Sequence, residues 1–203
     1  MYEGVSHKVH GKFTKIWDSD KVDLLILREN TEGLYYSTLQ RSFKRIKGEK
    51  FREYPPLSFP DLGDEVAWDP RPISRKGTER IVHRAFEYAV KREGNPHNKK
   101  VTCVDKSNVT KGCQLFRSTF DEVSKEYPSI GTTHAYVDAF TMWMIRNPED
   151  FDVVVTSNLF GDIITDLGSV LQGGMGMAAS GNIGDTHGLF EPVHGSSPKY
   201  AGL

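Results

Sequence analysis

Two aspartates four residues apart, Asp162 and Asp166, are the part of this sequence whose type and spacing point most directly to chemistry. They lie in a stretch that reads as a helix, and a spacing of four places both carboxylates on one helical face, about 6 Å apart at Cβ. Neither has a lysine or arginine beside it in the sequence. A divalent cation held by oxygen ligands, Mg²⁺ or Mn²⁺, is the simplest compensation for the two charges. The alternative is that one aspartate caps the helix and the other is solvated.

The aspartates follow an apolar run, Phe151 and Val153 to Val155, that shows no alternation. Such a run is typical of a strand buried on both faces in a largely parallel sheet, and ligands bind such sheets beyond the carboxyl ends of the strands. We therefore expect function where the sequence turns polar after Val155. Several glycines further on would let the backbone approach a ligand closely, although no G-x-G-x-x-G motif follows a strand: Gly173, Gly174, Gly176, Gly181 and Gly184.

Two more buried strands are predicted, and each is followed by residues that could do chemistry. Arg28 follows the strand Val22 to Leu27 and could clamp a carboxylate, while Tyr35, a little later, could exchange a proton. Lys106 follows the strand Val101 to Val104 and is a candidate general base. The alternatives are a structural ion pair for Arg28 and an ordinary surface lysine for Lys106.

Helices are predicted between these strands. Apolar stripes mark one helix from about Ile81 to Gly94, one that contains Leu115 to Val123, and one from Ala139 to Arg146. Asp138 stands just before the last helix, where it could be an N-cap or a third carboxylate for the metal. None of the seven histidines has a zinc-site pattern, so we expect no zinc.

The region from Tyr36 to Arg71 is polar, aromatic and marked by prolines, with no helical period. Irregular spans of this length are unusual in a compact domain unless they pack on something else. We interpret residues 36–71 as an extended hairpin or arm that reaches toward a partner subunit. A flexible surface loop is the alternative, although the apolar side chains in the span favour cover.

Composition narrows the class of protein. The chain has 203 residues, 37% of them hydrophobic, and a formal net charge of −1, so no global field would draw it to nucleic acid or to an anionic membrane. No apolar run approaches a membrane span, and the N-terminus lacks the apolar core of a signal peptide, which favours the cytoplasm. The two cysteines fit neither a disulfide framework nor a zinc ribbon.

Six motifs in order along the chain resemble one family: RENTEGLY, DKSN, YVDA, NLFGDIITD, GNIGD and LFEPVHGSSPKYAG. Together they resemble the β-decarboxylating dehydrogenases, the isocitrate and 3-isopropylmalate dehydrogenase family. The resemblance implies an α/β fold, a mostly parallel sheet flanked by helices with an extended dimerisation arm. It also implies oxidation of an (R)-2-hydroxy acid by NAD or NADP, followed by loss of CO₂ with the help of a divalent metal.

The resemblance assigns roles to individual residues. Asp162 and, less directly, Asp166 match metal ligands, and Asp138 matches the ligand from the other subunit. Lys106 matches the lysine that helps to take the hydroxyl proton, and Tyr35 matches the tyrosine that helps to protonate the enol. Arg28 matches an arginine that binds a substrate carboxylate, and Asn108 matches a residue near the nicotinamide amide. The loop that cradles the adenosine half of the cofactor is matched by His194, Gly195 and Ser196. Because Lys106 and Asp138 are expected to cross the interface, the resemblance implies a homodimer with shared active sites.

The resemblance leaves cofactor and substrate open. Lys199 and Tyr200 stand where NAD-preferring members usually carry an acidic residue, and a cation there favours the 2′-phosphate of NADP. Phe160, Pro192 and Val193 are more similar to the isopropylmalate and tartrate or malate branches than to the NADP-isocitrate branch. The substrate is therefore expected to be a small hydroxy acid: 3-isopropylmalate, isocitrate, tartrate, D-malate or homoisocitrate.

The resemblance also implies a domain organisation. Residues 1–150 are expected to form mainly the smaller, dimer-forming domain with its arm, and residues 151–203 the metal-binding helix and part of the larger domain with the cofactor loop. The family's opening strand and closing segment are expected to be missing. A non-catalytic, dimerising or regulatory subunit is one alternative. A metal-dependent phosphoryl-transfer enzyme is another, but it would need a phosphate-cradling loop that the sequence lacks.

Overall fold

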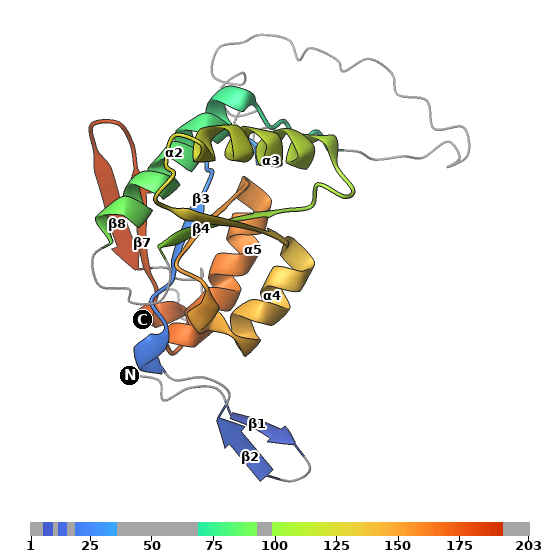
Figure 1. Cartoon of the computed structure of the whole chain (residues 1–203). Coiled ribbons are helices and arrows are strands. Elements are labelled where there is room, and N and C mark those ends of the chain that lie inside the picture. Colours follow the sequence, from blue (N-terminus) through green and yellow to red (C-terminus); the bar gives the residue numbers. More distant parts are fainter. Residues whose placement is uncertain (1–5, 10–11, 16–18, 36–68, 93–98, 193–203) are drawn as a thin grey trace, which may run out of the picture.

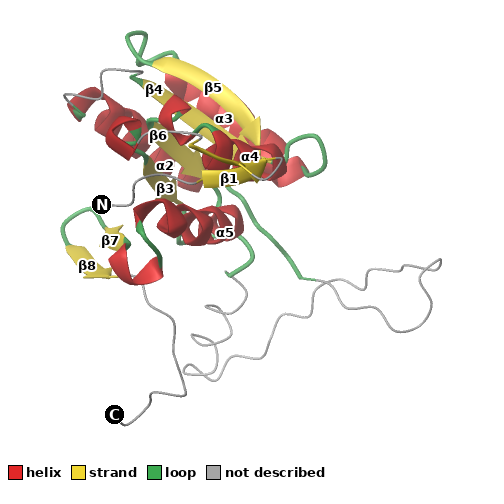
Figure 2. Cartoon of the chain, turned by 90° about the horizontal axis from the view of Figure 1, so that it is seen from below, coloured by secondary structure: helices red, strands yellow, loops and turns green. Residues whose placement is uncertain are grey.

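A four-stranded parallel sheet is the centre of the computed structural model, which describes residues 6–9, 12–15, 19–35, 69–92 and 99–192. The strands lie side by side in the order β3-β6-β4-β5 (Figures 1 and 2). Their bounds are β3 Leu25–Arg28, β4 Lys100–Asp105, β5 Gly131–Tyr136 and β6 Val153–Thr156. Because all four run parallel, their carboxyl ends meet at one edge of the sheet.

Helices cover both faces of this sheet (Figure 1). Helices α2, Arg75–Lys91, and α3, Lys111–Ser124, pack on one face. Helices α4, Val137–Arg146, and α5, Asn158–Ser169, pack on the other. Strand β6 shows the reason, since Val153 and Val155 join the first core and Val154 joins the second. The prediction from the unbroken run of valines, a strand buried on both faces of the sheet, is therefore confirmed.

Two antiparallel hairpins lie outside the parallel sheet. Strands β1, Ser6–Val9, and β2, Lys12–Lys15, form one, and β7, Ala179–Ile183, and β8, Gly188–Pro192, form the other. In Figure 1 the second hairpin lies beside α2. Short 3₁₀ turns complete the described elements: η1 Ser19–Lys21, η3 Pro148–Asp150, η4 Val170–Gln172 and η5 Met175–Met177.

The predicted strands and helices are confirmed, with shifts at their ends. Strand β3 begins three residues later than expected and includes Arg28, and α2 ends at Lys91, before Gly94. Several elements were not predicted, among them the β1–β2 hairpin. Strand β5 is an edge strand whose exposed threonines give no apolar signal, and the glycine-rich stretch after α5 forms 3₁₀ turns and the β7–β8 hairpin. Of the expected arm, only residues 69–71 lie within the described part of the chain.

None of the helices in the described residues is long and apolar enough to cross a membrane.

Candidate active site at the carboxyl ends of the strands

The carboxyl end of β3 and the start of α5 bring three of the predicted site residues together. Arg28 Nη1 donates to Asp162 Oδ1 at 2.5 Å, and the Tyr35 hydroxyl donates to Asp162 Oδ2 at 3.1 Å. The Arg28 guanidinium also lies 5.5 Å from the centre of the Tyr35 ring. The cation that is missing beside Asp162 in the sequence is therefore supplied by a strand 134 residues away. The ion pair that was the alternative for Arg28 is formed, and it is formed with a candidate metal ligand.

Asp162 perturbs the acidity of its tyrosine neighbour. The hydrogen bond from the phenol to the Asp162 carboxylate, and the negative charge of that carboxylate, raise the pKa of Tyr35 above its ordinary value. The Arg28 charge acts in the opposite sense but is outweighed. A phenol that stays protonated beside a carboxylate is suited to donate a proton rather than to accept one.

Gly161 allows Arg28 to reach Asp162. A Cβ at position 161 would stand 2.4 Å from Arg28 Cγ and 2.7 Å from Arg28 Cβ, closer than real carbon atoms approach. The aliphatic part of the arginine therefore lies directly against the bare backbone of α5. A side chain at Gly161 would displace Arg28 from the helix that carries Asp162.

Asn158, the first residue of α5, is the second partner of Arg28. Its Oδ1 accepts from Arg28 Nη2 at 2.9 Å and from Arg28 Nε at 3.3 Å. Its Nδ2 donates to the backbone carbonyl of Glu32 at 3.0 Å. The residue is only 3% exposed, so these bonds are shielded from water.

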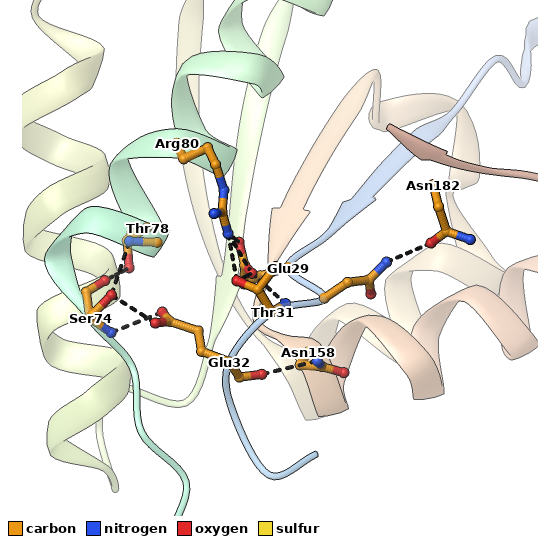
Figure 3. Close-up of polar contacts among 10 residues, drawn as sticks. Glu29, Thr31, Glu32, Ser74, Thr78, Arg80, Asn158 and Asn182 are labelled. Atoms are coloured by element: carbon orange, nitrogen blue, oxygen red, sulfur yellow. Dashed lines mark hydrogen bonds and ion pairs between the residues drawn. The ribbon is translucent and has the colours of Figure 1, made fainter. Parts of the chain in front are cut away.

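The residues after Arg28 turn back to contact α2 (Figure 3). Glu29 is buried, and its carboxylate accepts two bonds from Arg80 Nη2, at 2.8 and 2.9 Å, and one each from the amide and hydroxyl of Thr31. These four hydrogen bonds tie the carboxylate to Arg80 and Thr31. Glu29 therefore fixes the turn that follows Arg28.

Glu32 fixes the same turn at a second point, the N-terminus of α2 (Figure 3). Its carboxylate accepts from the Ser74 amide at 2.9 Å and from the Ser74 hydroxyl at 2.7 Å, while Ser74 caps the helix by accepting from the Gly77 amide. A carboxylate at this end of a helix is also favoured by the helix dipole. A Cβ at Gly77 would stand 2.6 Å from the Glu32 carboxylate, so the close approach requires glycine.

A second group of predicted site residues lies where β4 and β5 end. Lys106 Nζ donates to Asp138 Oδ1 at 2.6 Å and lies 5.6 Å from the centre of the Tyr136 ring. The backbone beneath is anchored by Asp105, a buried carboxylate that accepts from Arg117 and from the Ser107 amide. The Asp138 side chain is 66% exposed, whereas that of Lys106 is 25% exposed, so the carboxylate is the outward-facing member of the pair.

The prediction that Asp138 could be an N-cap is wrong. Helix α4 begins at Val137 with Tyr136 as its N-cap residue, and Asp138 lies inside the first turn. The hydrogen bond from Lys106, together with bonds from the first-turn amides, lowers the pKa of the Asp138 carboxyl. Asp138 is therefore an ionised, outward-facing carboxylate.

The other predicted site residues are more exposed or lie elsewhere. Asp166 is exposed on α5, one turn beyond Asp162, and Asn108 is exposed in the turn after β4. The residues expected to contact the adenosine half and the 2′-phosphate lie outside the described residues: His194, Gly195, Ser196, Lys199 and Tyr200.

Within the described residues, no group of three or more His, Cys, Asp or Glu side chains could hold a metal ion. One chain thus presents Asp162 and Asp166 at one place and Asp138 at another. The donor set still fits a hard divalent cation, because the carboxylates of Asp162 and Asp138 are 41% and 66% exposed and supply oxygen atoms. A three-carboxylate site would need both groups to meet.

A cavity of about 570 Å³ lies away from these residues, against β5 and the end of α4. It is lined by Lys100, Thr102, Thr133, His134, Ala135, Trp143, Asn147, Asp150 and Phe151. None of the predicted site residues is among them.

Sequence reasoning did not assign Asn158, Glu29, Glu32 or Arg80 to the site. Each is an ordinary polar residue in the sequence, and its role depends on a partner in another element. Gly161 could have been found, because a glycine inside a helical pattern requires a reason.

The fold and this arrangement of side chains identify the class. A model of the isocitrate/isopropylmalate dehydrogenase family matches residues 6–203, and the chain belongs to that family. The isocitrate dehydrogenase of Methylococcus capsulatus has a similar structure, with a TM-score of 0.69 and 40% sequence identity, over 88% of this chain and 47% of that one. The predicted α/β fold of this family is confirmed.

Two curated relatives that are similar in sequence are named for different substrates. The chain is 42% identical to the 3-isopropylmalate dehydrogenase of Clostridium pasteurianum, over 90% of this chain and 45% of the relative. It is 43% identical to the homoisocitrate dehydrogenase of Methanocaldococcus jannaschii, over 91% of this chain and 46% of the relative. The chain therefore spans a little under half the length of these relatives.

Proposed function

We propose that this protein takes part in the oxidative decarboxylation of an (R)-2-hydroxy acid, with 3-isopropylmalate as the first candidate substrate. The observation that carries the proposal is the meeting of Arg28, Tyr35 and Asp162 at the carboxyl ends of the sheet, in a chain of this family. An arginine for a carboxylate, a protonated phenol and an oxygen ligand for a cation are the groups that this reaction uses.

The roles follow from the chemistry of each side chain. Arg28 would bind a substrate carboxylate through the guanidinium edge that now contacts Asp162, and Asp162 with Asp166 would hold Mg²⁺ or Mn²⁺. When bound, the cation would supply stabilisation of negative charge on oxygen, and the cofactor would supply a hydride acceptor for the carbinol carbon. Lys106 would take up the hydroxyl proton. After CO₂ leaves and its bonding electrons form the enolate, Tyr35 would donate a proton.

We propose further that the active site is shared between two copies of the chain. The pair Lys106 and Asp138 lies on one group of elements and Asp162 on another, and one chain offers no three-carboxylate group among its described residues. Exposed apolar side chains on α4 and α5 support pairing through these helices: Met142, Trp143 and Ile163 are 52%, 40% and 50% exposed. A second copy would cover them and bring its Lys106 and Asp138 to Asp162.

The cofactor is proposed to be NADP rather than NAD on the charge of Lys199. Lys199→Asp is expected to shift the ratio of kcat/KM for NADP and NAD toward NAD, because a carboxylate repels the 2′-phosphate and can accept from the ribose hydroxyls. The initial rates with the two cofactors at one substrate concentration series measure the ratio. An unchanged ratio would contradict the assignment.

A substrate panel tests the proposed reaction. The protein is incubated with 3-isopropylmalate, isocitrate, D-malate, tartrate or homoisocitrate, each with NAD or NADP and with Mg²⁺ or Mn²⁺, and reduced cofactor is followed by absorbance. Release of CO₂ in step with cofactor reduction is expected for at least one hydroxy acid. The absence of both signals with every combination would contradict the proposal.

Mixing inactive variants tests the shared site. Lys106→Met and Asp162→Asn would each inactivate a different half of the site. When the two variant proteins are mixed and allowed to exchange subunits, some dimers would carry one intact site, and activity should reappear. Activity that stays at the level of the separate variants would show that each chain completes its own site.

A further inference from the structure

We propose that Asn158 is a positioning residue that sets the orientation of the Arg28 guanidinium, so that its Nη1 side, which contacts Asp162, is the side that would receive a substrate carboxylate. Its neutral amide is the essential property. This inference rests on the proposed function, because it names the residue on which the carboxylate-binding role of Arg28 depends. The local geometry alone, however, can be tested without any substrate.

The hydrogen bonds fix which way the amide of Asn158 faces. Oδ1 accepts from Arg28, which has only donors, and Nδ2 donates to the Glu32 carbonyl, which can only accept. A flipped amide would place donors against donors and an oxygen against an oxygen. Since Asn158 is 3% exposed, water could not replace the lost bonds.

Asn158 and Asp162 contact different sides of the guanidinium. Asn158 Oδ1 occupies the edge formed by Nε and Nη2, while Nη1 points to Asp162. A substrate carboxylate would therefore meet Arg28 on the Nη1 side, where Asp162 lies. The arginine stem cannot swing toward α5, because it already lies against Gly161.

The carbonyl that holds Asn158 is itself held from α2 (Figure 3). The Glu32 carboxylate accepts two bonds from Ser74, and the amide of Gly33 donates to the Pro72 carbonyl at 2.8 Å. Gly33 has a φ of +92°, and a Cβ there would stand 3.0 Å from Asn158 Cβ. A chain of fixed contacts thus runs from the start of α2, through the turn after β3, to Asn158 and Arg28.

The neutral charge of Asn158 distinguishes this role from simple packing. An aspartate has the same shape and could still accept from Arg28, but it would place a second carboxylate on the guanidinium beside Asp162. The added negative charge would weaken the attraction of Arg28 for a substrate carboxylate, and the new oxygen would face the Glu32 carbonyl. Asn158→Asp should therefore fold and yet bind a carboxylate ligand poorly.

Arginine side-chain NMR on the 203-residue chain tests the geometry. The Nε–Hε signal of Arg28, assigned by its loss in Arg28→Lys, should exchange with water at least about tenfold more slowly than an exposed arginine, because Asn158 accepts from it. Asn158→Ala should abolish this protection. Asn182→Ala is the matched control, since Asn182 is an exposed asparagine whose amide bonds Asn30 and does not contact Arg28. Arg28 protection that is unchanged in Asn158→Ala, with circular dichroism showing a folded protein, would overturn the proposal.

Calorimetric titration with 3-isopropylmalate in the presence of Mg²⁺ tests the consequence for binding. Asn158→Asp should raise Kd about tenfold or more, and Asn182→Asp should leave it within about twofold, a difference on the order of 1.4 kcal/mol. An unchanged Kd in Asn158→Asp, where Arg28→Lys raises it, would overturn the positioning role. If neither variant changes Kd, or if the wild-type protein does not bind, the proposed function fails, while the NMR result still decides whether Asn158 positions Arg28.

Discussion

The two groups of candidate active-site residues differ in how firmly they are held. At the ends of β3 and β6, Arg28 contacts both Asp162 and Asn158, and Asn158 is fixed in turn by Glu32. At the ends of β4 and β5, Lys106 forms an ion pair with the exposed Asp138 and lies over the Tyr136 ring. The first group is held by several side-chain partners, among them the buried Asn158, whereas in the second group the acceptor Asp138 is 66% exposed and only the backbone beneath is anchored by a buried carboxylate.

This difference fits a division of work between the two groups. The backbone below Lys106 is fixed by the buried Asp105, so the second group is not loosely folded. Its side chains nevertheless end in an ion pair whose carboxylate is largely exposed, and such a carboxylate can readily exchange one partner for another. A shared site would suit this arrangement. The first group would bind substrate from a fixed position, and Lys106 and Asp138 of the second group would change partners when they meet another subunit.

The largest expected effect is on turnover. Asp162→Asn should lower kcat with Mg²⁺ by at least about 100-fold, because even groups that stand behind a metal ligand contribute about 10- to 100-fold. The measurement is kcat with the hydroxy acid that is active in the substrate panel. Asp121→Asn is the control, as Asp121 is an exposed aspartate of α3 that pairs with His134. Near-normal turnover in Asp162→Asn would remove Asp162 from the metal site.

The bracing of the first group predicts a loss of stability. Glu29→Gln should lower the free energy of unfolding by about 1–3 kcal/mol, because an NH₂ group would replace one oxygen that accepts from Arg80 or Thr31 in a buried place. Urea unfolding followed by circular dichroism measures the change. Glu122→Gln is a suitable comparison, since Glu122 pairs with Arg75 on the surface and should have a much smaller effect. Equal effects of the two substitutions would contradict a difference between buried and exposed partners.

A smaller effect is expected on the acidity of Tyr35. Asp162→Asn should lower the pKa of Tyr35 toward its ordinary value of about 10, because the carboxylate that raises it is removed. A raised pKa in the folded state contributes stability that is present below the unfolded pKa and is lost as pH rises through the folded pKa. Titration of ¹³C-labelled tyrosine, with Tyr35→Phe to assign the signal, gives the value. An unchanged pKa would show that the Tyr35–Asp162 bond does not form in solution.

The smallest effect is expected in the second group. Lys106→Met should raise the pKa of Asp138 toward its ordinary value, because the hydrogen bond from Lys106 is the main cause of its lowering. A lowered pKa contributes stability that is present above the unfolded pKa and is lost as pH falls through the folded pKa, so the urea midpoint at pH 7 should hardly change for this exposed pair. Carboxyl ¹³C titration measures the pKa. A large loss of stability at pH 7 would show that the second group is as firmly braced as the first.

The sequence predicted much of the framework because the framework depends on local patterns. Apolar runs rich in β-branched residues predicted β4 and β6, and apolar stripes predicted α2, α3 and α4. It did not predict β5, whose outward residues are polar because the strand is at the edge, or the β7–β8 hairpin, whose glycines and exposed side chains give no clear alternation. A strand or helix shows a recognisable pattern of apolar residues only where it is buried, and these three strands are mostly exposed.

The sequence by itself determined which residues could do chemistry here and that they follow strands, because residue type and position relative to an apolar run are local properties. Only the tertiary structure decided their partners. The strand order places β3 beside β6, and this alone brings Arg28 to Asn158 and Asp162, more than 125 residues further along the chain. Residues so far apart carry no local signal of their contact, so the choice of partner belongs to the packing of the sheet.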